Sequence, residues 1–70
     1  MTMNREFCAE RANEARRDAG AAALDNVRDR HLRAAAAWDV LGARAARTLR
    51  QRAETEARKA AAAAETAAAE

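Results

Sequence analysis

Alanine supplies 24 of the 35 hydrophobic residues in this 70-residue chain, and this bias limits what the chain can fold into. Alanine has the highest helix propensity of any residue, and its small side chain buries little surface. The chain has two Gly and no Pro, Ser, Ile or Tyr. Sandwiches, barrels and α/β domains need β-branched residues and turn formers at regular intervals. We therefore expect an all-α protein.

The larger hydrophobic residues number only 11, which predicts a thin core. Burying one such side chain contributes roughly 1.5–3 kcal/mol, whereas ordering each residue costs about 1.5 kcal/mol. A lone copy of the chain is therefore expected to be marginally stable. Self-association as a homodimer, or a place as a subunit of a larger protein complex, would supply the missing core.

The first expected helix spans about residues 4–19. Asn4 is a good N-cap residue, Glu6 lies in the first turn, where the helix dipole favours an anion, and Gly20 is a natural C-terminal stop. Small residues recur in this helix at alternating steps of four and three. They define one seam that lets two helix axes approach closely: Cys8, Ala12, Ala15, Ala19 and Ala22.

The second expected helix starts at about residue 26, with Asn26 as its N-cap, and nothing stops it before the end of the chain. Its apolar stripe contains larger side chains: Val27, His31, Ala34, Ala35, Trp38, Leu41, Gly42, Ala45 and Leu49. Residues 53–70 are a low-complexity, Ala-rich segment with no large side chain to pack. We expect this segment to form a solvated helical tail that frays.

A short connection between the two helices predicts an antiparallel hairpin over residues 1–52. With the turn near residues 22–23, facing residue numbers sum to about 45, which places Phe7 and Cys8 beside Trp38. The second helix then extends beyond the first from about Ala46. The expected fold is a two-helix antiparallel hairpin with a long, overhanging second helix, which dimerises into a four-helix bundle.

His31 and Cys8 are the side chains with the most reactive chemistry. We expect His31 to be an imidazole at the edge of the core, hydrogen-bonded to Glu14 or Asp18. Cys8 fills the seam as a small apolar group, or cross-links a dimer if two seams meet. One His and one Cys more than 20 residues apart cannot form a metal site, and a two-helix hairpin offers little concavity for catalysis. We therefore expect no metal, no cofactor, no small-molecule substrate and no catalytic residue.

Positive charge gathers in the second helix, where residues 27–52 carry a net charge of +5, against −1 for residues 1–26 and −2 for residues 53–70. No acidic residue interrupts the run of Arg44, Arg47, Arg50 and Arg52. Their spiral suits either a solvated, ion-pairing face or contact with an anion such as a phosphate backbone. No aromatic residues interleave with them, and Ala is a poor membrane anchor.

The stretches FCAERANEARRDA (7–19) and NVRDRHLRAAAAWDVLGARAAR (26–47) resemble a group of short, uncharacterised, Ala/Arg-rich helical-hairpin proteins of alphaproteobacteria. Those proteins have a helix with an Ala seam, a short connector, a Val-Arg pair, a His, and an aromatic residue seven positions after the His. Trp38 stands where Tyr is usual, Gly42 where Ala is usual, and Ala34 where Leu is common. The resemblance implies a hairpin and brings no biochemical function. The matching positions are Val27, Arg28, His31, Trp38, Gly42 and Ala45.

These observations favour a non-enzymatic protein–protein interaction or assembly module that acts through Ala-lined helix packing. Its expected packing residues are Phe7, Cys8, Ala12, Ala15, His31, Trp38, Leu41, Gly42 and Leu49. Trp38 and Gly42, four residues apart, form either a packing unit or an interface hot spot. In the dimer, Leu49, Leu41 and the outer side of Trp38 would be covered.

The alternative is a small nucleic-acid-associated or regulatory protein that uses the Arg-rich part of the second helix. Its contacts would come from Arg28, Arg30, Arg33, Arg44, Arg47, Arg50 and Arg52. The charged N-terminus lacks the apolar region of a signal peptide, and no stretch of about 18 residues is free of charge. We therefore expect a cytoplasmic protein without a membrane span.

Overall fold

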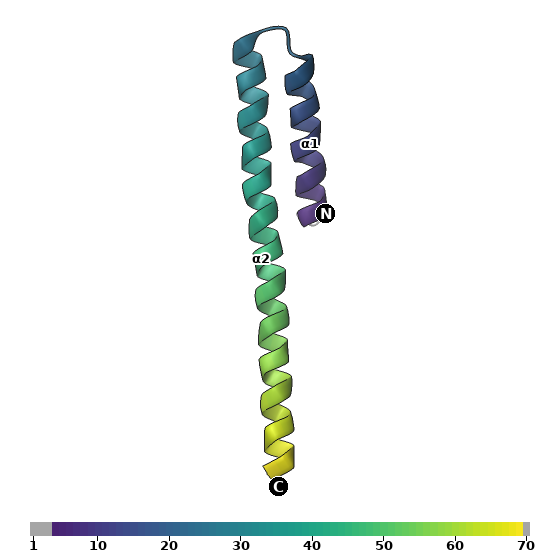
Figure 1. Ribbon diagram of the computed structural model, residues 1–70, viewed down its shortest axis with the longest axis vertical. Coiled ribbons are helices and arrows are strands. Elements are labelled where there is room, and N and C mark those ends of the chain that lie inside the picture. Colours follow the sequence, from purple (N-terminus) through teal and green to yellow (C-terminus); the bar gives the residue numbers. More distant parts are fainter. Residues whose placement is uncertain (1–3, 70) are drawn as a thin grey trace.

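The computed structural model describes residues 4–69, which form two α-helices packed side by side in opposite directions (Figure 1). The helices are α1 (Arg5–Ala21) and α2 (Asp25–Ala69), and the described residues contain no strand. The expected all-α hairpin is confirmed. The 45 residues of α2 at 1.5 Å per residue account for the length of the molecule, whose dimensions are 70 × 17 × 15 Å.

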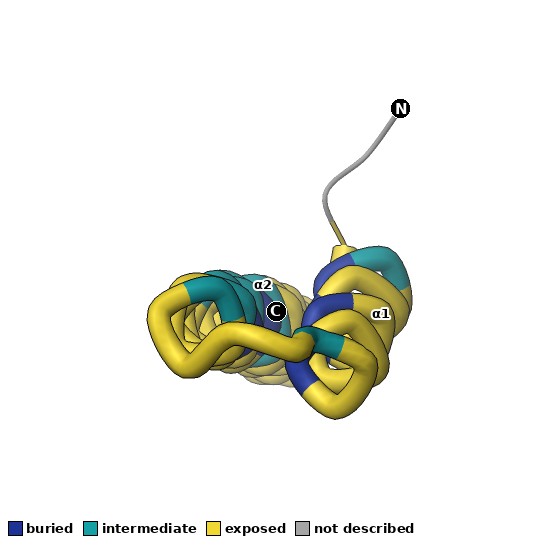
Figure 2. The backbone as a smooth tube through the Cα atoms, turned by 90° about the horizontal axis from the view of Figure 1, so that it is seen from above, coloured by how far each residue is buried: buried dark blue, intermediate teal, exposed yellow. Residues whose placement is uncertain are grey.

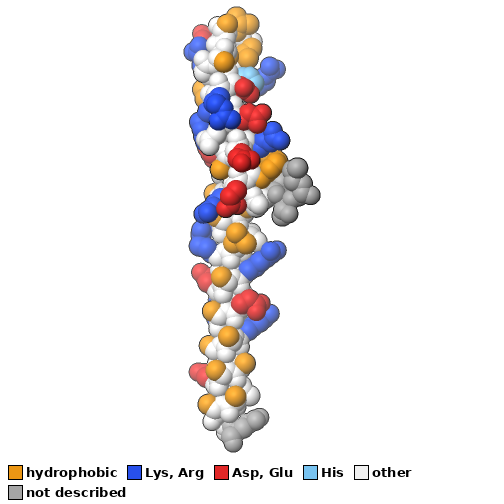
Figure 3. All heavy atoms as spheres, turned by 90° about the vertical axis from the view of Figure 1, so that its right-hand side faces the viewer, with side chains coloured by type: hydrophobic (Ala, Val, Ile, Leu, Met, Phe, Trp, Pro, Cys, Tyr) orange, Lys and Arg blue, Asp and Glu red, His pale blue; other side chains and the backbone are white. Residues whose placement is uncertain are grey.

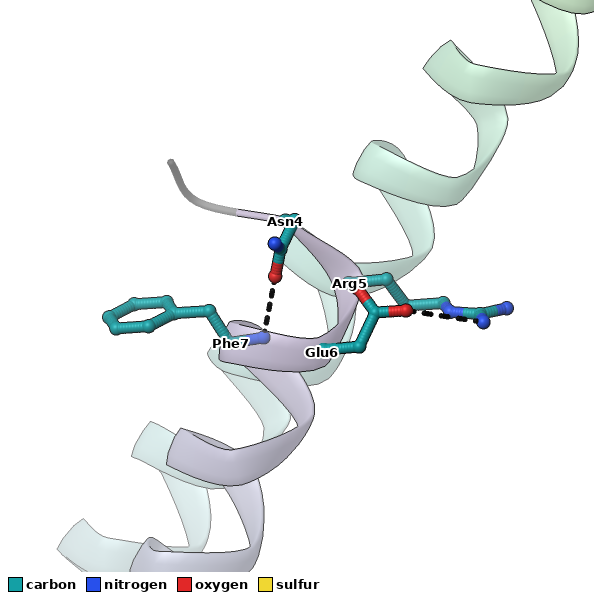
Figure 4. A network of polar contacts seen from close by, with 4 residues as sticks. All are labelled: Asn4, Arg5, Glu6 and Phe7. Carbon is teal, nitrogen blue, oxygen red and sulfur yellow. Dashed lines mark hydrogen bonds and ion pairs between the residues drawn. The ribbon is translucent and has the colours of Figure 1, made fainter. Parts of the chain in front are cut away.

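The first helix begins where its N-cap was predicted. The side-chain oxygen Oδ1 of Asn4 accepts a hydrogen bond of 2.8 Å from the backbone N–H of Phe7 (Figure 4). The backbone N–H groups of a first helical turn have no partner within the helix, so this bond satisfies one of them. Glu6 lies in the same turn, with its Oε1 3.5 Å from a guanidinium nitrogen of Arg5.

The end of α1 corrects the role predicted for Gly20. That glycine is inside the helix, which continues to Ala21, and none of the described glycines has a positive φ. The chain leaves the helix at Ala22 in an extended conformation, and the N–H of Ala22 donates to the carbonyl oxygen of Ala19 at 3.3 Å. Gly20 was a poor guide because this exit does not use the left-handed conformation that favours glycine.

The start of α2 is also one residue earlier than predicted. Asp25 is the first helical residue, so Asn26 lies inside the first turn and is not the N-cap. The carbonyl oxygen of Leu24 accepts a 3.0 Å hydrogen bond from the N–H of Arg28. The carboxylate of Asp25 lies 3.5 Å from the Arg28 guanidinium and occupies the turn where a helix dipole favours an anion.

The core is a single seam of small side chains between the two helices. The predicted seam of α1 faces α2, and four of its five members are buried: Cys8, Ala12, Ala15 and Ala19. From α2 the buried residues are Ala35 and Gly42. Figure 2 shows these segments facing each other across the hairpin. Among the described residues Cys8, at 1% exposure, is the largest fully buried side chain, so the axes approach closely and the core is thin.

The register of the hairpin differs from the predicted one at Cys8. A Cβ atom built on Gly42 would lie 3.3 Å from the Cβ of Cys8, so Gly42 faces this residue. An indole ring is too large to lie between two closely packed axes. Trp38 therefore lies at the edge of the seam, where it contacts Phe7 as predicted.

The lower half of α2 has no partner helix among the described residues (Figure 1). The first turn of α1 reaches the level of Leu49 and Arg50, where Arg5, Glu6 and Ala46 line a shallow groove with them. Residues 51–69, which we call the overhang, continue the same helix with no break at residue 53. Neither helix contains, within residues 4–69, an apolar stretch long enough to cross a membrane.

Candidate interaction surfaces

Two aromatic side chains mark one edge of the seam. The rings of Phe7 and Trp38 meet edge to face, with centroids 5.8 Å apart and an interplanar angle of 78°. The guanidinium of Arg11 lies over the Phe7 ring, 5.2 Å from its centroid. Such aromatic pairs contribute about 0.5–1.5 kcal/mol beyond their buried area. We call Phe7, Trp38 and Leu41 the aromatic edge, and all three are only half-buried.

A shallow groove of about 420 Å³ runs along this edge between the helices. Phe7 and Trp38 form its apolar part, and Ala15 lies between them and the turn. Its remaining lining residues are charged: Arg11, Glu14 and Asp18. Arg11 and Glu14 form an ion pair of 3.1 Å. The groove thus combines an apolar end with a polar end, a combination typical of protein interaction surfaces.

The predicted packing residues separate into two sets. Cys8, Ala12, Ala15 and Gly42 are buried between α1 and α2, so the hairpin itself uses them. The other five remain accessible to a partner to different degrees: Phe7, His31, Trp38 and Leu41 are half-buried, and Leu49 is 58% exposed. The sequence did not separate these sets because both follow the same helical spacing.

His31 does not form the predicted hydrogen bond. Within residues 4–69 its half-buried imidazole has no hydrogen bond or ion pair to Glu14 or Asp18, and Glu14 pairs with Arg11 instead. Arg11 is three residues from Glu14 on the same helix, so this pair needs no particular register between the helices. No group of three or more His, Cys, Asp or Glu side chains suited to a metal ion occurs in the same range.

An ion pair between the helices was missed by the sequence reasoning. Arg16 of α1 donates to a carboxylate oxygen of Asp39 in α2 at 3.0 Å, and to the side-chain oxygen of Asn13 at 2.7 Å. It is the one ion pair between α1 and α2 among the described residues. The pair is exposed, so its contribution to stability is about 0–1 kcal/mol. Because Cys8 lies opposite Gly42, Arg16 of α1 and Asp39 of α2 lie on the same edge of the seam as each other. Predicting this pair would have required the register of the two helices.

The four arginines of the basic run lie on α2 around the level where α1 ends. All four are exposed, and they form what we call the basic arc: Arg44, Arg47, Arg50 and Arg52. The ion pairs of residues 4–69 engage other cations, namely Arg5, Arg11, Arg16, Arg28 and Lys59. Within α2 no carboxylate occurs between Asp39 and Glu54, a distance of about 22 Å along the helix axis.

Comparison of the chain with protein-family models, with curated proteins and with solved structures found no match. The resemblance to the alphaproteobacterial hairpin proteins therefore stays a prediction.

Proposed function

We propose that the protein is a non-enzymatic interaction module that pairs with a second copy of itself, so that two hairpins form a four-helix bundle. One observation carries this proposal. Among residues 4–69 the buried side chains are all small, whereas the Val, Leu, Phe and Trp side chains are half-buried or exposed. Exposed members of the second group are Leu24, Leu32, Val40 and Leu49, with exposures between 46% and 63%.

The aromatic edge is the surface that supports this pairing best. Leu41 lies on the same side of α2 as Trp38, and Phe7 from α1 extends that side across the seam. Leu49 lies farther along α2, beside the end of α1. A second hairpin placed here would bury side chains that a single hairpin leaves partly in water. Each fully buried Leu contributes roughly 1.5–3 kcal/mol, so a few of them offset much of the thin core.

Sedimentation equilibrium tests the proposal because it measures mass without regard to shape. We expect a concentration-dependent equilibrium between monomer and dimer. A folded monomer at every concentration would overturn pairing with a second copy. In that case the same surface would need a different protein, as a subunit of a larger complex does.

Two neighbouring residues allow a matched test of the surface. Leu41→Gln removes an apolar side chain from the aromatic edge, and we expect at least about tenfold weaker dimerisation, because 1.4 kcal/mol corresponds to a factor of ten. Val40→Gln makes a similar change on the side of α2 turned away from α1, where Val40 is 56% exposed. It should leave the dimer unchanged. If Val40→Gln weakens the dimer and Leu41→Gln does not, pairing uses the opposite face.

A further inference from the structure

We propose that the basic arc binds duplex nucleic acid through its phosphate backbone, without reading the base sequence. This inference goes beyond the proposed pairing, since it uses other residues of α2. The basic arc consists of four exposed guanidinium groups on one helix. None of them takes part in an ion pair with any residue between 4 and 69.

The four arginines of the basic arc spread over about half of the circumference of α2. At about 100° per residue, Arg50 and Arg52 lie at the two edges of an arc of about 200°, with Arg44 and Arg47 between them. Gly42 faces α1, so this arc is the half of α2 that is turned away from α1. Below the end of α1, basic side chains project from both edges of α2 (Figure 3).

The shape of this surface matches a groove with charge on both walls. An α-helix is about 10–12 Å across, and the major groove of duplex DNA is about 12 Å wide with phosphates along both sides. Arginines spread over half of the circumference of a helix reach the phosphates on both walls of such a groove. A flat anionic surface would contact fewer of these arginines. The covered side of the helix, in line with Gly42, would face away from the duplex.

The positive charges of the basic arc outnumber the carboxylates near them. The Debye length at physiological ionic strength is about 8 Å, so carboxylates farther away screen these arginines weakly. Asp39 is paired with Arg16, and Glu56 lies 3.7 Å from the ammonium group of Lys59. Asp39 and Glu56 are thus engaged with other cations, whereas Glu54, two residues after Arg52, forms no ion pair within residues 4–69. With Glu54 counted, residues 43–54 still carry a net charge of +3.

Apart from its arginines, which can also contact guanine, this segment has few side chains that read bases. A side-chain amide reads adenine because it has both a donor and an acceptor. Gln51 is the one amide side chain between Ala43 and Ala53. No aromatic side chain is available there to stack on bases. A membrane surface suits the segment less well, because Leu49 is its one bulky apolar residue.

Fluorescence anisotropy with two short DNA duplexes of unrelated sequence tests the inference. We expect equal binding to both, with a slope of log K against log salt concentration of about −0.9 for each phosphate neutralised, or about −3.6 for four arginines on one bound chain. Raising the salt concentration fourfold should therefore weaken binding on the order of 100-fold. Absence of salt-sensitive binding would overturn the inference.

Two double variants with the same loss of charge separate a local site from general attraction. Arg47→Gln with Arg50→Gln removes half of the basic arc and should halve the salt slope. Arg17→Gln with Arg58→Gln removes two exposed arginines that lie outside the basic arc and form no ion pair within residues 4–69, and it should leave the slope unchanged. Equal losses in the two variants would contradict a site at the basic arc. Circular dichroism checks that both variants stay helical.

A vesicle experiment addresses the other polyanion. Vesicles of equal parts phosphatidylserine and phosphatidylcholine should bind the protein less tightly than the duplexes at the same salt concentration. Tighter binding to the vesicles would overturn the inference in favour of a membrane surface. Sedimentation equilibrium of the Arg47→Gln, Arg50→Gln variant is expected to match the parent protein. The pairing proposal and the nucleic-acid proposal can therefore fail independently of each other.

Discussion

At the scale of single residues, the two glycines have different surroundings although both lie inside helices. Nothing lies within 4 Å of a Cβ built on Gly20. A Cβ on Gly42 would lie 3.3 Å from the Cβ of Cys8 and 3.9 Å from the carbonyl oxygen of Arg5. Cβ atoms belong to the rigid part of a side chain, so they cannot rotate away. Gly42 therefore sets how closely the helices approach, and Gly20 has no such role.

Substituting alanine for each glycine should change the free energy of unfolding by different amounts. Gly20→Ala is expected to raise the free energy of unfolding by about 0.5–1 kcal/mol, because alanine is a better helix former than glycine. Gly42→Ala gains the same propensity but crowds Cys8, so its net gain should be smaller or negative. Gly42→Leu should be strongly destabilising. Urea unfolding at one fixed protein concentration measures all three. Equal stabilisation by the two alanines would show that Gly42 is not a close contact.

Some of these residue-level features could be predicted from the sequence, and others could not. The cap at Asn4 depends on residues within one turn, so the local pattern was sufficient to find it. The contact between Phe7 and Trp38 was also predicted. The pair of Arg16 with Asp39 was not, because it depends on the register of two helices. That register is decided by which side chains fit between the axes.

At the scale of the helices, α2 has two parts with different support. Its first half packs against α1, whereas the overhang, residues 51–69, is exposed at every position except the half-buried Thr55. Most of the stability of a helix in a protein comes from packing against other elements, which the overhang lacks within residues 4–69. Thr55 and Thr66 donate to the carbonyl oxygens of Gln51 and Ala62, four residues before them, a bond that slightly weakens a helix. The overhang should therefore be the least stable part of the fold.

Hydrogen exchange should reveal this difference along α2. We expect strong protection of the amides of α2 that pack against α1 and weak protection after about residue 55, since the overhang opens without disturbing the seam. Mass spectrometry of peptides from the exchanged protein measures the profile. Strong protection as far as residue 68 would mean that a partner covers the overhang. Repeating the measurement on Leu41→Gln shows whether such a partner is the second copy.

The number, direction and relative length of the helices followed from the sequence, whereas the end of α1 and the start of α2 did not. Apolar periodicity and helix propensity act over whole segments, so a hairpin with an overhang was predicted. Gly20 and Asn26 misled at the ends, because the chain turned through Ala22 and began α2 at Asp25. A terminus depends on one or two residues whose preferences differ by small energies.

At the scale of the whole molecule, the separation of small buried residues from larger exposed ones links stability to association. A single hairpin buries few large side chains. If a second copy covers the aromatic edge, folding and pairing are coupled. The sequence predicted the residues of the seam and those of the partner surface as one set. Apolar periodicity does not distinguish the face of a helix that packs within the hairpin from the face that contacts a partner.

The midpoint of thermal unfolding should therefore rise with protein concentration, because a partner that binds the folded chain shifts the unfolding equilibrium. Circular dichroism melts over a hundredfold range of concentration measure this rise, and the free energy of unfolding changes by at most about 2.7 kcal/mol over that range. Val40→Gln should show the same dependence as the parent protein, and Leu41→Gln a weaker one. A midpoint that is independent of concentration for all three proteins would contradict the coupling.

The elongated shape of the hairpin has a consequence for its hydrodynamics. At 70 × 17 × 15 Å, the molecule is more than four times as long as it is wide. A rod of this kind experiences more friction than a sphere of equal mass, so it diffuses slowly and tumbles anisotropically. On a gel-filtration column a single copy would elute early, as a larger globular protein would. A second hairpin packed alongside would thicken the rod more than lengthen it, so pairing would raise the mass while lowering the frictional ratio.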